Sequence, residues 1–165
     1  MRYKITIEYD GTSLLGWQEQ LDGPSVQDYL QRALSCFTPL EETNDAPLSD
    51  EEYEDAGTGR RLQKTDKIIV SGAGRTDAGV HATAQVAHFD LKEDLVDWKL
   101  REAINARLRE MEAPVSVIAV EKVGNDFHAR FSARGRGYLY RILNRRAPAV
   151  LEKNRVWWVP VPLDV

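Results

Sequence analysis

The sequence has a single cysteine, Cys36, among its 165 residues. An internal disulfide and a multi-cysteine zinc site are therefore excluded, and a reducing compartment is indicated. Apolar runs extend over only a few residues, so neither a membrane-spanning segment nor a signal peptide is visible. With 42% hydrophobic residues, the chain is still long enough for one domain with its own core. We therefore expect a cytoplasmic domain that does not contact a membrane.

Basic residues are missing from one stretch of the chain and concentrated in another. Residues 41–55 contain eight acidic side chains and no Lys or Arg, whereas residues 130–155 contain eight Lys or Arg and only Glu152 of opposite charge. The net charge of −4 at pH 7 therefore hides a basic segment, which also contains Tyr138 and Tyr140. This combination is typical of an RNA-contacting surface. A solvated strand edge protected by charge has the same composition.

The pattern of apolar residues predicts two helices and five strands. Alternation predicts strands at residues 3–9, 67–71, 85–90, 115–123 and 137–143, and helical spacing predicts helices after Ser25 and after Asp97. This β-α-β-β-α-β order with one added strand predicts an α+β fold of the split βαβ (ferredoxin-like or RRM-like) type, with an antiparallel sheet and helices on one face. The free face of such sheets is a frequent platform for single-stranded RNA, which is an analogy at the level of the fold.

Residues 38–66 separate the first helix from the second strand. They include Pro39, Pro47, Gly57 and Gly59 among mostly polar and acidic residues. A segment of this composition buries too little apolar surface to become ordered. We therefore expect an inserted, mobile acidic loop over about residues 38–66.

The stretch GAGRTDAGVHATAQ, residues 72–85, combines small residues with one arginine, one aspartate and one histidine. Its glycines, which include Gly74, allow another group to approach the backbone closely. Arg75 and Asp77 are two residues apart, so in an extended chain they share a face and can form an ion pair. From the residues alone, two interpretations follow: Asp77 caps a turn, or it is a functional carboxylate.

The whole sequence resembles the N-terminal part of the TruA-type tRNA pseudouridine synthases. The similarity runs in order through YDGT, GWQ, SVQDYLQRAL, GAGRTDAGVHATAQVAHFD, DFHARFSA and YLYRI. The resemblance implies the N-terminal half of the pseudouridine synthase fold, with Asp77 as the catalytic carboxylate, Arg75 paired to it and Tyr138 against the target base. It also implies isomerisation of uridine at positions 38 to 40 in the anticodon arm of tRNA by a homodimeric protein.

The chemistry of this reaction suits these residue types. The bond from ribose C1′ to uracil N1 breaks and the base rejoins through C5, so no atom is gained or lost and no cofactor is required. A carboxylate is a suitable nucleophile for the electron-poor sugar centre, and we assign this role to Asp77. Attack on the base and removal of a sugar proton remain alternatives. Arg75 favours an ionised carboxylate, and Tyr138 can stack on an extruded base and help move the C5 proton.

Further RNA contacts are expected from the residues around these motifs, namely Gly74, His81, His128, Arg130, Arg136 and Arg141. A hydrogen bond to the glycine-rich backbone also explains His81. A metal site is not expected, because the sequence has only one Cys and three His and an isomerisation needs no Lewis acid. The alternative function is a non-catalytic RRM-like module that binds RNA.

Three features depart from the family pattern: the acidic insertion, Gly137 in place of a larger residue, and a chain that stops at PLDV. In the family, a further helix and a second half of similar size follow that point. We therefore expect residues 1–165 to be the N-terminal half that carries Asp77. Alone, this half should fold but be weakly active or inactive, because the second half is missing.

Overall fold

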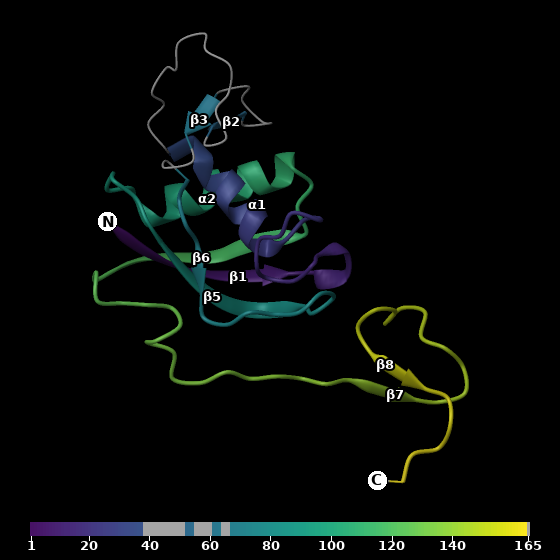
Figure 1. The fold of residues 1–165 in the computed structure, drawn as a ribbon. Helices are drawn as coiled ribbons and strands as arrows, with labels where there is room; N and C mark the ends of the chain where they lie inside the picture. Colours follow the sequence, from purple (N-terminus) through teal and green to yellow (C-terminus); the bar gives the residue numbers. More distant parts are fainter. Residues whose placement is uncertain (38–51, 55–60, 64–66, 165) are drawn as a thin grey trace. The chain divides into compact units, whose positions relative to one another are not determined.

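The computed structural model describes residues 1–37, 52–54, 61–63 and 67–164. They belong to two compact units, Met1–Ser132 and Ala133–Val165, and each is described by itself. The larger unit contains strands β1 (Arg2–Tyr9), β2 (Glu52–Glu54), β3 (Arg61–Gln63), β4 (Ser71–Gly72), β5 (Ala82–Asp90) and β6 (Val115–Val123), helices α1 (Val26–Leu34) and α2 (Asp97–Glu110), and two 3-10 turns, Gly11–Ser13 and Ser35–Phe37 (Figure 1). None of the helices among the described residues combines the length and apolarity needed to span a membrane.

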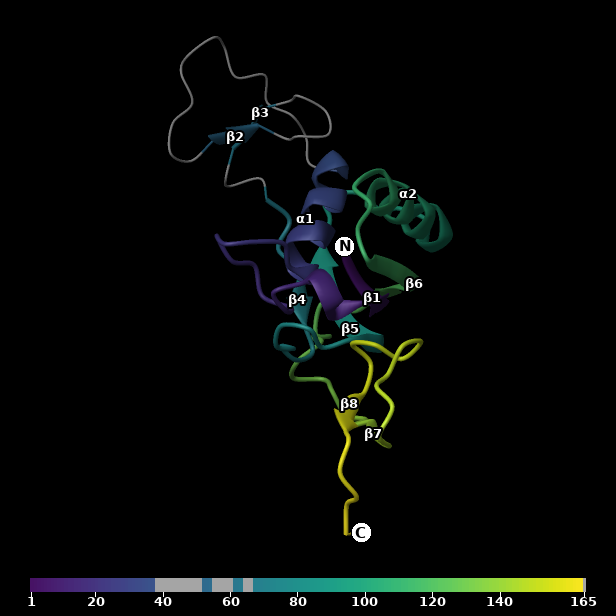
Figure 2. The same ribbon diagram turned by 90° about the vertical axis from the view of Figure 1, so that its right-hand side faces the viewer.

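Four of these strands form one antiparallel sheet in the order β4-β5-β1-β6. The central strand β1 alternates as the sequence predicts, because its apolar side chains at positions 3, 5, 7 and 9 are at most 5% exposed. Both helices cover the same face of the sheet (Figures 1 and 2). The unit is therefore a mixed α/β structure whose core lies between the antiparallel sheet and the two helices.

The two helices begin where their sequence signals indicate. The hydroxyl of Ser25 accepts a hydrogen bond from the backbone N–H of Asp28 at 3.1 Å, which is the expected N-terminal cap of α1. Helix α2 begins at Asp97 and buries Leu100, Ile104 and Leu108, as its spacing predicts. Both helix predictions are confirmed.

Two predictions in the first half of the chain are corrected. The strand expected at residues 67–71 is limited to Ser71–Gly72, because only these two residues pair with β5. The loop expected at residues 38–66 contains β2 and β3, which pair antiparallel with each other. The other residues of that loop, including most of the acidic stretch 41–55, lie outside the described residues, so its mobility stays a prediction.

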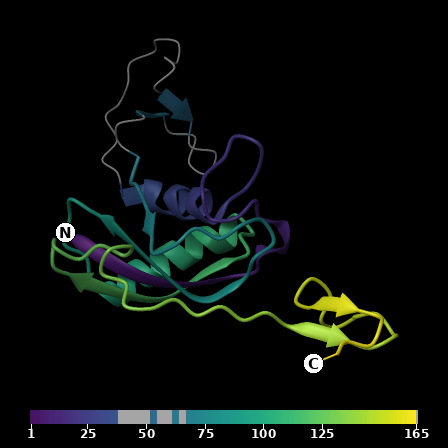
Figure 3. The same cartoon turned by 60° about the horizontal axis from the view of Figure 1, so that its bottom comes forward.

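The face of the sheet opposite the helices is only partly free. The segment that follows β6 within the larger unit, residues 124–132, returns to this face (Figure 3). Arg2 on β1 donates through Nη1 to the carbonyl oxygens of Asn125 and Phe127 at 2.7 and 2.9 Å. The backbone N–H of Ala129 donates to Nδ1 of His88 on β5 at 3.2 Å. The expectation of an uncovered face is therefore corrected, because residues 125–129 cover part of it.

The smaller unit contains a parallel pair of strands, β7 (Ile142–Asn144) and β8 (Trp157–Val159). The side chain of Asn144 joins them to the residues that follow, since it donates to the carbonyl oxygens of Val159 and Val161. The strand expected at residues 137–143 begins only at Ile142, and it pairs with β8 rather than extending the four-stranded sheet. Residues 138–140 belong to no strand and are 73–90% exposed.

Candidate active site

Asp77 lies in the loop that joins β4 to β5, and its side chain is exposed, as is that of Arg75. Among the ion pairs formed by described side chains there is none between Arg75 and Asp77. The partnership that the family resemblance implies for these two residues therefore remains a prediction. An exposed carboxylate is nevertheless accessible to a large substrate.

The backbone on both sides of Asp77 is fixed to the segment that follows β1. The N–H of Trp17 donates to the carbonyl oxygen of Thr76 at 3.0 Å, and the N–H of Gly79 donates to that of Leu14 at 3.3 Å. Gly16 makes this contact possible, because its φ is +102° and a Cβ there would lie 2.4 Å from the oxygen of Thr76. The loop that carries Asp77 is therefore a well-supported structure rather than a loose connection.

Trp17 fills the space beneath the start of this loop. Its side chain is 2% exposed, and a Cβ on Gly72 would lie 2.5 Å from the indole ring. The glycines of this stretch predicted that another group approaches the backbone closely. At Gly72 that group is the indole ring of Trp17, a core side chain of the protein itself. At Gly74 the carbonyl oxygen accepts from Nε2 of Gln85 at 2.6 Å, which fixes the next turn of the loop.

Two polar side chains complete the support. The hydroxyl of Tyr9, at the end of β1, shares a hydrogen bond of 2.9 Å with Oγ1 of Thr76. Burial raises the pKa of the Tyr9 phenol, against the effect of its hydrogen bonds to Thr76 and Gln85. Nδ1 of His81 accepts from the N–H of Gly11 at 3.1 Å. The hydrogen bond expected between His81 and the glycine-rich stretch is therefore corrected, because His81 binds the backbone of Gly11 in the YDGT turn.

The DFHARFSA segment places an aromatic group beside the sheet. The ring of His128 lies 4.6 Å from that of His88 and 4.4 Å from that of Phe131, measured between centroids. Phe131 is 79% exposed, whereas His88 is buried. Burial lowers the pKa of His88, and the nearby His128 and Arg2 lower it further. His128 and Arg130 were predicted from the sequence as RNA contacts and Phe131 was not, although an aromatic residue next to a basic one was the available signal.

The remaining predicted contacts belong to the smaller unit. Tyr138 is 73% exposed, which suits a residue meant to meet a base. Arg136 is exposed as well, and Nη1 of Arg141 forms an ion pair of 2.6 Å with Glu152. Asp77 belongs to the larger unit and these residues to the smaller one, and each unit is described by itself. Within the described residues, no group of three or more His, Cys, Asp or Glu side chains is arranged to hold a metal ion.

Sequence motifs do not by themselves reveal what supports Asp77. No role was predicted from the sequence for Tyr9, Leu14, Gly16 or Trp17. Their signal was available in the motifs YDGT and GWQ, which stand about 60 residues before Asp77 in the chain. The structure explains these motifs, because both of them contact the loop that contains Asp77.

Known proteins are similar to this chain over nearly its full length. Residues 5–132 match the family described as tRNA pseudouridine synthase. The chain is 47% identical over 163 residues to tRNA pseudouridine synthase A of Mesorhizobium japonicum, and 46% identical over 165 residues to that of Paramagnetospirillum magneticum. Each match covers 99% of this chain but 55% and 53% of the relative, so the chain spans about half the length of the curated relatives it matches. The chain therefore belongs to the tRNA pseudouridine synthase family.

Proposed function

We propose that the protein containing this chain isomerises uridine to pseudouridine at positions 38 to 40 in the anticodon stem-loop of tRNA, with Asp77 as the nucleophile. One observation carries the proposal. Asp77 is exposed, yet the residue before it is held by the N–H of Trp17 and by the hydroxyl of Tyr9. A carboxylate that is accessible but held in place is what attack on a bound substrate requires.

The proposed reaction begins at the sugar. A carboxylate oxygen of Asp77 bonds to ribose C1′, and uracil N1 leaves with the electron pair of the broken bond. The uracil then turns, C5 bonds to C1′, and the carboxylate is released. Finally C5 loses its proton and N1 gains one, so that the atoms balance and no cofactor takes part.

The target uridine must leave its base stack before a carboxylate reaches its sugar. We assign Arg75 to the gap that the extruded base leaves, because an exposed guanidinium suits a phosphate or a stacked neighbour. We assign Tyr138 to the extruded uracil, where its ring stacks and its hydroxyl helps to remove the C5 proton. The exposure of Tyr138 supports this role.

Other side chains are proposed to hold the tRNA. Phe131 and His128 offer a stacking surface for a base, and the guanidinium groups of Arg130, Arg136 and Arg141 bind phosphates. Gly74 and His81 contribute through the loop that they fix. The strand order of the sheet supports a ferredoxin-like core. We further propose that the complete protein is a cytoplasmic homodimer. The family match favours an enzyme over the RRM-like binding module.

The proposed function is tested with Asp77→Asn in the full-length protein. The amide keeps the shape of the side chain but removes its nucleophilic charge. We expect no conversion of an unmodified tRNA and nearly unchanged tRNA affinity. Asp22→Asn, at another exposed aspartate, is the matched control and should retain activity. Appreciable turnover by Asp77→Asn would contradict the assignment.

A further inference from the structure

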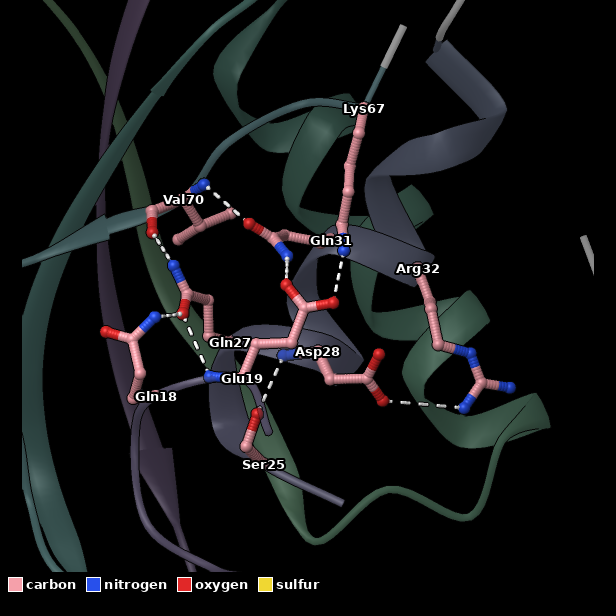
Figure 4. Close-up of polar contacts among 9 residues, drawn as sticks. All are labelled: Gln18, Glu19, Ser25, Gln27, Asp28, Gln31, Arg32, Lys67 and Val70. Carbon is pink, nitrogen blue, oxygen red and sulfur yellow. Dashed lines mark hydrogen bonds and ion pairs between the residues drawn. The ribbon is translucent and has the colours of Figure 1, made fainter. Parts of the chain in front are cut away.

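Helix α1 carries two buried glutamines that the proposed reaction does not use. Gln27 and Gln31 lie one turn apart and are 9% and 3% exposed. A buried side-chain amide is costly unless its N–H and C=O groups are hydrogen-bonded. Both amides have such partners, and the partners lie in two segments that lead to the active-site loop (Figure 4).

The first segment is the chain that enters β4. Nε2 of Gln27 donates to the carbonyl oxygen of Val70 at 2.9 Å, and the N–H of Val70 donates to Oε1 of Gln31 at 3.3 Å (Figure 4). Val70 is fully buried, and the pairing of β4 with β5 begins only at Ser71. The two glutamines therefore satisfy both backbone groups of Val70, as a neighbouring strand would.

The second segment is the chain that follows Trp17. Oε1 of Gln27 accepts from Nε2 of Gln18 at 2.8 Å and from the N–H of Glu19 at 3.0 Å. Nε2 of Gln31 donates to Oε2 of Glu19 at 2.8 Å, and Glu19 also forms an ion pair with Lys67. Two segments that are far apart in the sequence are thus joined by the same two side chains.

Both segments lead to Asp77. The N–H of Gln27 also donates to the carbonyl oxygen of Trp17 at 3.0 Å, and the N–H of Trp17 binds the carbonyl oxygen of Thr76. On the other route, Gly72 stands two residues after Val70 and lies against the indole ring of Trp17. We propose that Gln27, assisted by Gln31, is a positioning residue that holds Asp77 in place for the isomerisation. The catalytic part of this proposal rests on the proposed function.

This arrangement predicts a loss of rate without a loss of binding. Gln27 is buried, so its replacement removes no surface that tRNA can contact. A displacement of about 1 Å at a reacting group can lower a rate roughly 100-fold. We therefore expect Gln27→Met, which is similar in size but has no amide, to lower the single-turnover rate about 10-fold or more. The tRNA affinity should stay within roughly twofold.

The experiment uses the full-length protein with three variants, Gln27→Met, Gln27→Glu and the control Gln20→Met. Gln20 is an exposed glutamine of the same region. In Gln27→Glu the ionised carboxylate repels the carbonyl oxygen of Val70. Burial raises the pKa of this carboxyl group, so that it becomes protonated as the pH falls. The protonated carboxyl can then donate a hydrogen bond to Val70 as the amide does. The rate of Gln27→Glu relative to wild type should therefore recover as the pH falls, whereas that of Gln27→Met should not.

A readout that does not depend on activity completes the test. Amide hydrogen exchange over residues 71–79 should be faster in Gln27→Met than in wild type or Gln20→Met, while β1 stays protected. If the wild type does not isomerise uridine, the proposed function fails and the exchange result still tests the positioning. Unchanged hydrogen exchange over residues 71–79 in Gln27→Met would overturn the proposal. A loss of rate in Gln27→Met that is matched by an equal loss of tRNA affinity would overturn it too. So would a rate of Gln27→Glu, relative to wild type, that does not change with pH.

Discussion

The backbone N–H of Trp17 lies 3.0 Å from the carbonyl oxygen of Thr76, the residue immediately before Asp77. Trp17 is itself buried in the core between sheet and helices. Asp77, the exposed residue to which we assign catalysis, is thereby connected to the core through its neighbour Thr76 and one hydrogen bond. Substitutions in the segment that contains Trp17 should therefore shift the position of Asp77.

Gly16→Ala should reduce activity although Gly16 is buried away from solvent. An added Cβ meets the oxygen of Thr76 at 2.4 Å and forces an alanine into a left-handed conformation at φ +102°. Strain of this kind costs about 1–3 kcal/mol, and its relief would displace the Asp77 loop. We expect a lower melting temperature and a single-turnover rate at least about 10-fold lower.

Gly135→Ala is the matched control for this substitution, since nothing lies within 4 Å of an added Cβ there and the φ of Gly135 is not in the left-handed region. Its melting temperature and rate should remain those of the wild type. If Gly16→Ala also behaved as the wild type, the close packing between Gly16 and Thr76 would be unimportant for the site.

Tyr138→Phe separates stacking from proton transfer. The substitution keeps the ring face, so tRNA affinity should be unchanged. It removes the hydroxyl to which we assign removal of the C5 proton of uracil. The loss of a general base typically lowers a rate by about 100-fold or more, and we expect a loss of this size. Binding and single-turnover conversion are measured on the same tRNA. An unchanged rate would limit Tyr138 to stacking.

The helices and the long strands were predictable because their signals are local. The alternation in β1, the cap at Ser25 and the spacing of α2 each arise within one element, and the structure confirms all three. The strand at residues 67–71 was predicted too long because β propensity does not show whether a partner strand is present. Two buried glutamines on α1 supply that partner instead, and helical spacing of apolar residues does not identify them.

The sequence motif indicates Asp77 as the candidate residue, whose role stays a prediction, but it does not show how the loop that carries Asp77 is supported. Asp77 was recognised from its motif. The contacts that hold its neighbours Thr76 and Gly79 come from Tyr9, Leu14 and Trp17, which are distant in sequence and reach this loop only through the fold. The segment after β6 was likewise named for RNA contacts, while its packing against His88 depends on the register of the sheet.

Neutralising the acidic segment should strengthen the association with tRNA. Residues 41–55 carry eight acidic side chains and no basic one, so the rest of the chain has a net charge of −4 + 8 = +4. Replacement of all eight by Asn or Gln keeps the chain length and removes their repulsion of phosphates. The affinity should rise at low salt and the difference should shrink at high salt. An equal affinity at every salt concentration would show that this charge does not act on the RNA.

His88 should make the stability of the protein depend on pH. Its folded-state pKa is lowered by burial and by the nearby His128 and Arg2, against the smaller opposite effect of Asp90. In the unfolded chain a histidine titrates near about 6.5. Above that pH the side chain is neutral in both states, and its contribution to stability is complete. As the pH falls below it, the unfolded state takes up the proton first, so stability is lost until the folded-state pKa is passed.

His88→Asn tests this dependence, because the amide oxygen can still accept from the N–H of Ala129 but does not titrate in this range. Between pH 7 and pH 5 the melting temperature of the wild type should fall more than that of the variant. Asp90, whose pKa is lowered by its hydrogen bond to Arg2, contributes in a separate and more acidic range. If the melting temperatures of wild type and variant fell in parallel from pH 7 to pH 5, His88 would not take up a proton on unfolding in this range. The segment that covers His88 would then be held by other contacts.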